Sequence, residues 1–124
     1  MGRMRTRAEF LAARRGRRLN GPLFFIEARD RQDGAEARLG LTVTRKVGNA
    51  VERNRIRRRL REAVRLECGA DMAEGFDFVV VARRDLLSVP FAMLKSELSR
   101  RFARARPDRP KPGGTAGGHP SGTD

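Results

Sequence analysis

Cysteine, histidine, tryptophan and tyrosine are rare or absent in this chain of 124 residues. Cys68 is the single cysteine, which excludes an internal disulfide and a cysteine-based zinc motif. His119 is the single histidine, which excludes a catalytic or metal-binding histidine pair. Because the chain has no Trp or Tyr, stacking on nucleic-acid bases must use its seven phenylalanines or the planes of arginine side chains.

Long apolar runs are also lacking. None approaches the ~20 residues of a membrane-spanning helix, and the basic N-terminus lacks the apolar core of a secretory signal. We therefore expect a cytoplasmic protein that does not bind membranes. The acidic residues are scattered, with no metal-site spacing and no nucleophile beside a base. This argues against a self-sufficient nuclease, a hypothesis that cleavage by the protein alone would restore.

Positive charge is abundant instead. The chain has 28 Lys and Arg against 15 Asp and Glu, a net charge of +13. Such an excess predicts a polyanionic partner, which could be RNA, DNA or an anionic membrane surface. Arginine dominates over lysine, and guanidinium groups bind phosphates bidentately and stack on bases. We therefore favour RNA.

Residues 53–65 have the period of an amphipathic helix. Ile56, Leu60 and Val64 fall on one stripe that can pack on a core. Asn49, followed three residues later by Glu52, predicts a capping box at the helix start. The opposite face repels itself through like charges, and we interpret it as a docking surface for RNA phosphates rather than a solvated face. The candidate RNA-docking residues are Arg53, Asn54, Arg55, Arg57, Arg58, Arg61 and Arg65.

The segments before this helix predict one helix and a small sheet. Residues 1–5 read as a mobile basic leader, and Thr6 caps a short helix over 7–15. Strands are expected at 17–20, 23–28 and 38–44. Asp33 and Gly34 form a hairpin turn signal between the last two of these strands.

The segments after it predict a strand, a helix and a tail. Residues 76–82 contain the continuous apolar run 78–82, as in a central strand buried on both faces. Ser88 is expected to cap the last helix, in which Phe91, Leu94, Leu98 and Phe102 form a core stripe. The composition of 107–124, rich in proline and glycine, predicts a disordered tail, so that 1–106 form one domain.

Residues 40–65 read GLTVTRKVGNAVERNRIRRRLREAVR and carry a resemblance. They are similar to the signature of the bacterial ribonuclease P protein subunit, with Arg53, Asn54 and Arg55 as its hallmark. The chain up to about residue 105 fits this family in order and spacing. The resemblance implies an α+β fold, a two-layer αβββαβα sandwich like domain 2 of ribosomal protein S5, with a left-handed βαβ crossover around the basic helix.

The resemblance also implies a function in tRNA maturation. The chain would bind the catalytic ribonuclease P RNA, as a 1:1 complex, and the 5′ leader of precursor tRNA, and so assist endonucleolytic removal of the leader. The RNA would perform the hydrolysis with Mg²⁺. We expect no catalytic residue or metal ligand in the protein, and no obligate protein partner.

A cleft between the first helix and the sheet would hold the leader, with candidate contacts at Phe10, Arg14, Arg45, Lys46 and Arg83. For Phe10 a simple core contact is an equal alternative. Arg14 stands where the family often has a second aromatic residue. The rival hypothesis is a non-catalytic RNA- or DNA-binding module, such as a ribosome-associated protein. It shares the basic helix but leaves the completeness of the signature unexplained.

Overall fold

The computed structural model describes residues 2–68 and 72–105, apart from the side chains of residues 67 and 68. The tail predicted for 107–124 lies outside the described residues. The strands are β1 (Gly2–Arg3), β2 (Arg17–Asn20), β3 (Phe24–Asp30), β4 (Arg38–Thr42) and β5 (Phe76–Ala82). The helices are α1 (Arg7–Arg14), α2 (Ala50–Ala63), the π-helical turn η1 (Val64–Cys68), the 3₁₀ turn η3 (Arg84–Ser88) and α3 (Phe91–Arg104).

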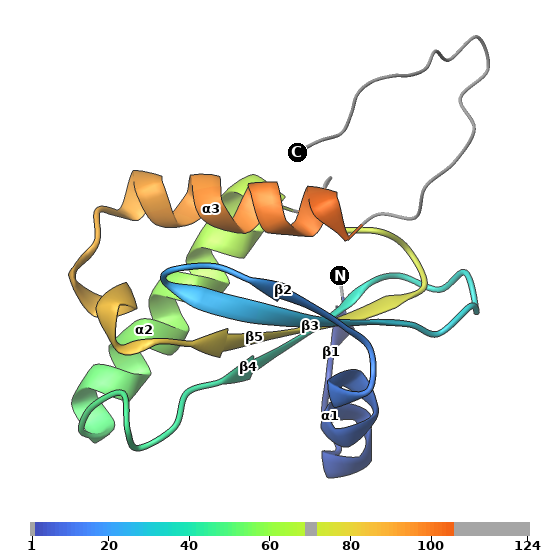
Figure 1. The fold of residues 1–124 in the computed structure, drawn as a ribbon, viewed down its shortest axis with the longest axis horizontal. Helices are drawn as coiled ribbons and strands as arrows, with labels where there is room; N and C mark the ends of the chain where they lie inside the picture. The colour runs from blue at the N-terminus through green and yellow to red at the C-terminus, as the bar shows by residue number, and fades with distance from the viewer. Residues whose placement is uncertain (1, 69–71, 106–124) are drawn as a thin grey trace, which may run out of the picture.

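The five strands form one sheet in the order β1-β4-β5-β3-β2 (Figure 1). β4 is parallel to both β1 and β5, whereas β3 is antiparallel to β5 and β2. The basic helix α2 connects the parallel neighbours β4 and β5. α2 and α3 cover one face of the sheet, and the shorter α1 lies against one end of the other face. The predicted α+β class and element order are confirmed, with one strand added.

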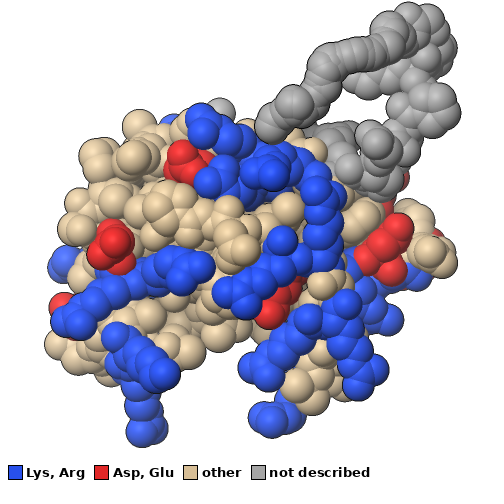
Figure 2. All heavy atoms as spheres, viewed as in Figure 1, with Lys and Arg blue, Asp and Glu red and all other residues tan. Residues whose placement is uncertain are grey.

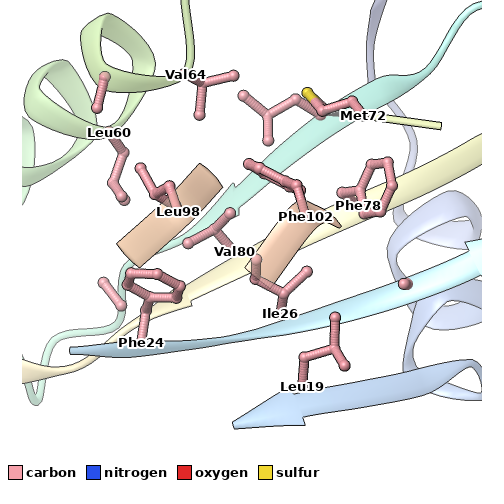
Figure 3. Close-up of a cluster of buried hydrophobic side chains, with 14 of the residues drawn as sticks. Leu19, Phe24, Ile26, Leu60, Val64, Met72, Phe78, Val80, Leu98 and Phe102 are labelled. Carbon is pink, nitrogen blue, oxygen red and sulfur yellow. The ribbon is translucent and has the colours of Figure 1, made fainter. Parts of the chain in front are cut away.

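The main core lies between the sheet and the two long helices (Figure 3). The predicted stripes of α2 and α3 are confirmed, since Ile56, Leu60, Leu94 and Leu98 are fully buried. Phe102 meets Phe78 of β5 edge to face, with ring centroids 5.0 Å apart. Each such side chain contributes roughly 1.5–3 kcal/mol through burial. This core fixes α2 on the sheet with its polar face outward.

β5 is the central strand that its composition predicts. Phe78 and Val80 point into the main core, and Asp77 and Val79 point to the opposite face, where both are also buried. A smaller apolar cluster forms there from Met4, Ala13 and Val79, with Phe10 and Val81 packed against it. α1 is therefore seated on β3 and β5, and it leaves the rest of this face of the sheet uncovered.

Residues 2–4 pair with the sheet, whereas the sequence predicted a mobile N-terminal segment. The N–H of Gly2 donates to the carbonyl of Ala37 at 2.8 Å, and the N–H of Met4 donates to that of Leu39 at 3.0 Å. Met4 is buried in the smaller cluster. The leader forms β1 because β4 would otherwise present an unpaired edge, and because Met4 gains burial there.

The predicted hairpin is wrong as well. β5 lies between β3 and β4, so Asp33 and Gly34 belong to a loop that crosses the end of β5. Gly34 has the positive φ, +69°, that suits a turn. The apolar strand β5 needs a neighbour on each side, and this long-range pairing overrides the local turn signal.

Two helix starts follow the prediction and one does not. Thr6 with Glu9 and Asn49 with Glu52 form complete capping boxes. Ser88 does not cap α3, because Pro90 occupies the N-cap position. The Ser88 hydroxyl instead donates to the carbonyl of Asp85 at 3.3 Å, within η3.

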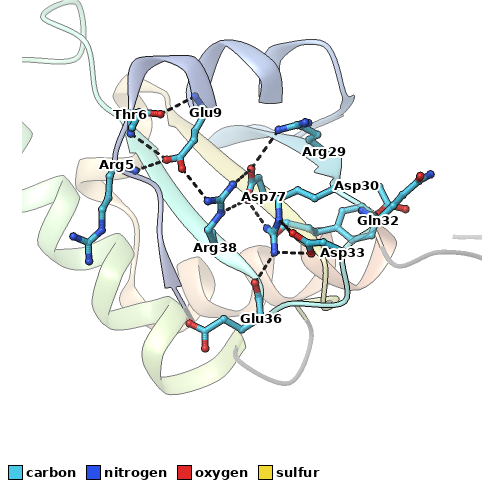
Figure 4. A network of polar contacts seen from close by, with 12 residues as sticks. Arg5, Thr6, Glu9, Arg29, Asp30, Gln32, Asp33, Glu36, Arg38 and Asp77 are labelled. Carbon is cyan, nitrogen blue, oxygen red and sulfur yellow. Dashed lines mark hydrogen bonds and ion pairs between the residues drawn. The ribbon is translucent and has the colours of Figure 1, made fainter.

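On the face of the sheet that carries α1, a buried carboxylate connects several elements (Figure 4). Asp77 of β5 is fully buried and accepts hydrogen bonds from Arg38 Nε at 2.7 Å, Arg38 Nη2 at 2.8 Å and Arg31 Nη1 at 2.6 Å. Arg38 also donates through Nη1 to Glu9 of α1 at 2.8 Å. Arg31 donates to the carbonyls of Phe76 and Glu36. The network joins β5, β4, the loop after β3 and α1.

The charges in this network stabilise each other. Burial alone would raise the pKa of Asp77, but the hydrogen bonds from Arg38 and Arg31 outweigh it and hold this pKa below its ordinary value. The pKa of Glu9 is lowered first by hydrogen bonds from the backbone N–H groups of Arg5 and Thr6, and then by the charge of Arg38. Both carboxylates are therefore ionised at neutral pH.

We expect Asp77→Asn to lower the free energy of unfolding by about 3 kcal/mol at pH 7, because it leaves two guanidinium groups without their buried counter-charge. A lowered pKa contributes stability that is complete above the unfolded value, about 3.9, and is lost as the pH falls through the folded value. The difference between variant and wild type should therefore shrink below about pH 4. Urea unfolding at several pH values measures it.

Asp85→Asn is the matched control, because Asp85 is exposed on η3. Its effect should stay within about 0.5 kcal/mol at every pH. An Asp77→Asn effect that is independent of pH would show that the charge of this carboxylate does not provide the stability.

Candidate RNA-binding surfaces

The polar face of α2 is presented by a helix with a well-defined start. The side chain of Asn49 accepts from the N–H of Glu52 at 2.9 Å, and the carboxylate of Glu52 accepts from the N–H of Asn49 at 2.9 Å. This capping box begins the helix one short turn after β4. Because Ile56 and Leu60 face the core, Arg58 on the opposite side of the helix faces outward.

Three of the predicted docking residues are free to bind a ligand. Arg55, Arg58 and Arg61 are exposed, and their side chains make no hydrogen bond or ion pair with any described residue. Their guanidinium groups present forked hydrogen-bond donors to solvent. They form an unneutralised row that suits a phosphate backbone.

The other predicted docking residues are partly engaged within the protein. Arg53 donates through Nη1 to the carbonyl of Gly48 at 2.8 Å. Arg57 donates to the side-chain oxygen of Asn54 at 3.0 Å. Arg65 pairs with Glu62, whose pKa is lowered mainly by this hydrogen bond. These contacts hold the side chains in place and leave further donors on each arginine.

Arg59 has a structural role and was not among the predicted docking residues. It is half-buried and donates to the carbonyl of Val89. Its guanidinium also lies 5.9 Å from the centre of the Phe91 ring. Arg59 thus links α2 to the start of α3.

A hollow of about 390 Å³ lies between the β1–β4 edge of the sheet and α2. The two sides differ in chemistry, since the strand side is largely apolar and the helix side is charged. The α2 side brings together three of the predicted docking arginines with one acid, and Phe10 of α1 borders the strand side. The lining residues are Gly2, Arg3, Met4, Phe10, Leu39, Gly40, Leu41, Arg57, Arg61, Glu62 and Arg65.

Phe10 combines the two roles that its sequence position left open. It is half-buried and packs against the cluster of Met4, Ala13 and Val79, while it also borders the hollow. The ring lies on Gly40 of β4, where a Cβ atom would come within 2.6 Å of Phe10 Cε1. A glycine at this position therefore allows the aromatic ring to reach the rim of the hollow.

The uncovered face of the sheet carries a second group of candidate residues. The strand register places Thr42, Val81, Phe25 and Asn20 in one row across four strands, beside α1. Phe25 is half-buried, and the guanidinium of Arg18 lies 3.7 Å from the centre of its ring. Aromatic rings and guanidinium planes of this kind stack on bases.

Arg83 joins this group from the end of β5. Its guanidinium lies 5.4 Å from the centre of the Phe25 ring, and its Nε donates to the carbonyl of Gly21 at 3.1 Å. Arg83 was predicted as a cleft contact, whereas Phe25 and Arg18 were missed. The signal for Phe25 was present, because it alternates with the core residues Phe24 and Ile26 and so had to face away from the main core.

The remaining predicted contacts lie apart from these two groups. Arg14 is exposed in the last turn of α1, and Arg45 and Lys46 are exposed in the turn after β4. None of the three is among the residues that line the hollow. They extend the basic character of the surface, and basic side chains spread over the face of the molecule in Figure 2 with few acidic ones between them.

Other classes of site find no support in the described part of the chain. Residues 2–68 and 72–105 contain no group of three His, Cys, Asp or Glu side chains that could hold a metal ion. The helices of this part are all too short or too polar to cross a bilayer.

Comparison with known proteins identifies the family. The sequence model of the family described as Ribonuclease P matches residues 2–106. The ribonuclease P protein component of Brucella suis is 48% identical over 128 residues, covering 90% of this chain and 91% of the relative. That of Bartonella quintana is 54% identical over 106 residues, covering 81% of this chain and 80% of the relative.

Solved structures agree with the fold. The ribonuclease P protein of Thermotoga maritima superposes with a TM-score of 0.75 at 29% identity, covering 86% of this chain and all of that protein. The protein of Staphylococcus aureus superposes with a TM-score of 0.72 at 24% identity and supports the fold alone. The matched sequence model and the two close relatives span the helix, the hollow and the sheet described above, and the chain therefore belongs to the ribonuclease P protein family.

Proposed function

We propose that this chain acts through two neighbouring RNA contacts. As a ribonuclease P protein component, it is a subunit of a tRNA-processing endoribonuclease. In our proposal the outer face of α2 docks on the catalytic RNA, and the uncovered face of the sheet holds the 5′ leader of precursor tRNA. The observation that carries the proposal is the hollow, because Phe10 of α1 and Arg57 and Arg61 of α2 line it together.

The docking contact rests on charge that the protein itself leaves unneutralised. Arg55, Arg58 and Arg61 have no partner among the described residues, although they repel one another along the helix. A phosphate backbone removes this repulsion and releases its own counterions, which gives a large, salt-dependent gain. Arg53, Asn54, Arg57 and Arg65 complete the same surface.

The leader contact rests on shape and on stacking groups. The row of Thr42, Val81 and Phe25 offers a shallow floor, α1 forms one wall, and Phe10 stands at its edge. A single strand fits this arrangement, because its bases can stack while its phosphates meet arginines. The flanking basic residues, which we include as secondary contacts, are Arg14, Arg45, Lys46 and Arg83.

The hydrolysis belongs to the RNA in this proposal, with Mg²⁺ held by RNA phosphates. Three acidic side chains are taken up within the protein: Asp77 and Glu9 bind arginines, and Glu52 caps α2. The protein contributes by lowering the repulsion between two RNAs, which reduces the Mg²⁺ concentration they need. We assign one protein to each catalytic RNA, in the cytoplasm, without another protein partner.

Replacing Arg58 and Arg61 together by alanine should weaken binding to the catalytic RNA. Each phosphate that the variant no longer neutralises should flatten the slope of log affinity against log salt by about 0.7–0.9, so the double variant should reduce the slope by somewhat less than two units. Titration of the catalytic RNA with protein at several salt concentrations measures the slope.

Arg100→Ala with Arg104→Ala is the matched control, because it removes the same charge from α3. Its slope should remain close to that of the wild type. Equal flattening in both double variants would mean that total charge, rather than the α2 face, determines binding.

With the catalytic RNA present, the protein should favour precursor tRNA over mature tRNA and should stimulate leader removal at low Mg²⁺. The physical reason is that only the precursor carries a single-stranded 5′ leader for the uncovered sheet face. Cleavage rates and tRNA affinities with and without the protein measure this, and an unrelated basic protein of similar size is the control. Equal binding of both tRNAs would favour the general RNA-binding module.

A further inference from the structure

α1 is attached to the sheet by few apolar contacts. It has eight residues, of which only Ala13 is buried, and Phe10 is half-buried. A helix of this length is not stable alone in water. Its place on the sheet, and with it the wall of the proposed leader cleft, therefore depends on polar contacts.

One carboxylate supplies most of these polar contacts. Glu9 Oε1 accepts from the N–H groups of Arg5 at 2.6 Å and Thr6 at 3.0 Å, which closes the N-terminus of α1. Glu9 Oε2 accepts from Arg38 Nη1 at 2.8 Å. The same side chain thus caps the helix and ties it to β4 (Figure 4).

Arg38 is itself held in a fixed position. Its Nε and Nη2 bind both oxygens of Asp77, at 2.7 and 2.8 Å, and Asp77 is fully buried and bound also by Arg31. Bidentate binding fixes the plane of the guanidinium, and its remaining Nη1 points at Glu9. Because Asp77 fixes Arg38, the bond from Arg38 to Glu9 determines where α1 lies on the sheet.

This contact lies directly beside the candidate site. Glu9 precedes Phe10, and Arg38 lies two residues before Gly40 on the same face of β4, where the Phe10 ring rests. We infer that Arg38, acting through Glu9, is a positioning residue that sets α1 and Phe10 for binding of the single-stranded leader. The inference rests on the proposed function and deepens it.

The variant Glu9→Gln separates the effect of the position of α1 from the effect of net charge on RNA binding. The glutamine oxygen still caps α1, but its NH₂ group then faces the donor Nη1 of Arg38, so the tie is broken. The net charge becomes more positive by one, which by itself would tighten RNA binding. If Arg38 positions α1 through Glu9, the variant should instead bind the leader more weakly. The Asp77 network stays intact, so the variant is expected to fold.

The test uses the holoenzyme of this protein with a bacterial ribonuclease P RNA. Affinity is measured for precursor tRNA with a long leader and with a single-nucleotide leader, and their ratio is the leader gain. We expect Glu9→Gln to reduce this gain by about five-fold, the scale of one typical intramolecular hydrogen bond. Affinity for the catalytic RNA should not fall below the wild-type value, and the cleavage rate at saturating substrate should remain unchanged.

Two control variants sharpen the result. Glu74→Gln makes the same charge change at an exposed residue before β5 and should leave the leader gain unchanged. Thr6→Ala removes the other half of the capping box, the N–H of Glu9 donating to Thr6 Oγ1, and leaves the tie to Arg38. It should lower the stability of α1 while keeping the leader gain.

The outcomes are distinct. A leader gain that Glu9→Gln leaves intact overturns the positioning role and leaves the proposed function standing. Weakening that is equal for both leaders overturns it too, because it indicates a general loss of structure. Absence of any leader gain in the wild-type holoenzyme overturns the proposed leader contact, and the positioning role with it.

Discussion

The pair of hydrogen bonds between Asp77 and Arg38 is the contact on which the packing of α1 against the sheet depends. It places a charge pair where α1, β4 and β5 meet, and the buried carboxylate is kept ionised by Arg38 and Arg31. A small apolar cluster alone would hold α1 weakly. Because the pair is directional, it also determines where α1 lies, which an apolar contact of the same size would not.

The same pair shows how the chain manages its large positive charge. Arginines near carboxylates or carbonyls, such as Arg31, Arg38 and Arg59, serve the fold. Those on the outer face of α2, such as Arg58 and Arg61, keep their charge available. The apolar stripe of α2 secures the helix on the core, so the repulsion on its outer face is tolerated, and in our proposal a polyanion neutralises it. The fold and the proposed binding thus use the same residue type in different surroundings.

Elements that depend on contacts between residues close in sequence could be predicted, and those that depend on distant residues could not. α2, its capping box and its core stripe depend on residues within a few positions of each other, and β5 contains the continuous apolar run 78–82, so these were predicted correctly. β1, the place of the loop around Gly34 and the Asp77 network depend on strands that pair far apart in the chain. The stacking of Arg18 on Phe25 requires the antiparallel register of β2 and β3, which no local pattern specifies.

A structure of the holoenzyme with precursor tRNA bound would test most directly whether two RNAs occupy two neighbouring surfaces of this protein. The expected result is catalytic RNA phosphates against Arg55 and Arg58, and leader nucleotides across Thr42, Val81 and Phe25, with the hollow beside Phe10 between the two RNAs. A structure in which the leader lies away from α1, with the uncovered face of the sheet in solvent, would contradict the division between docking helix and leader cleft.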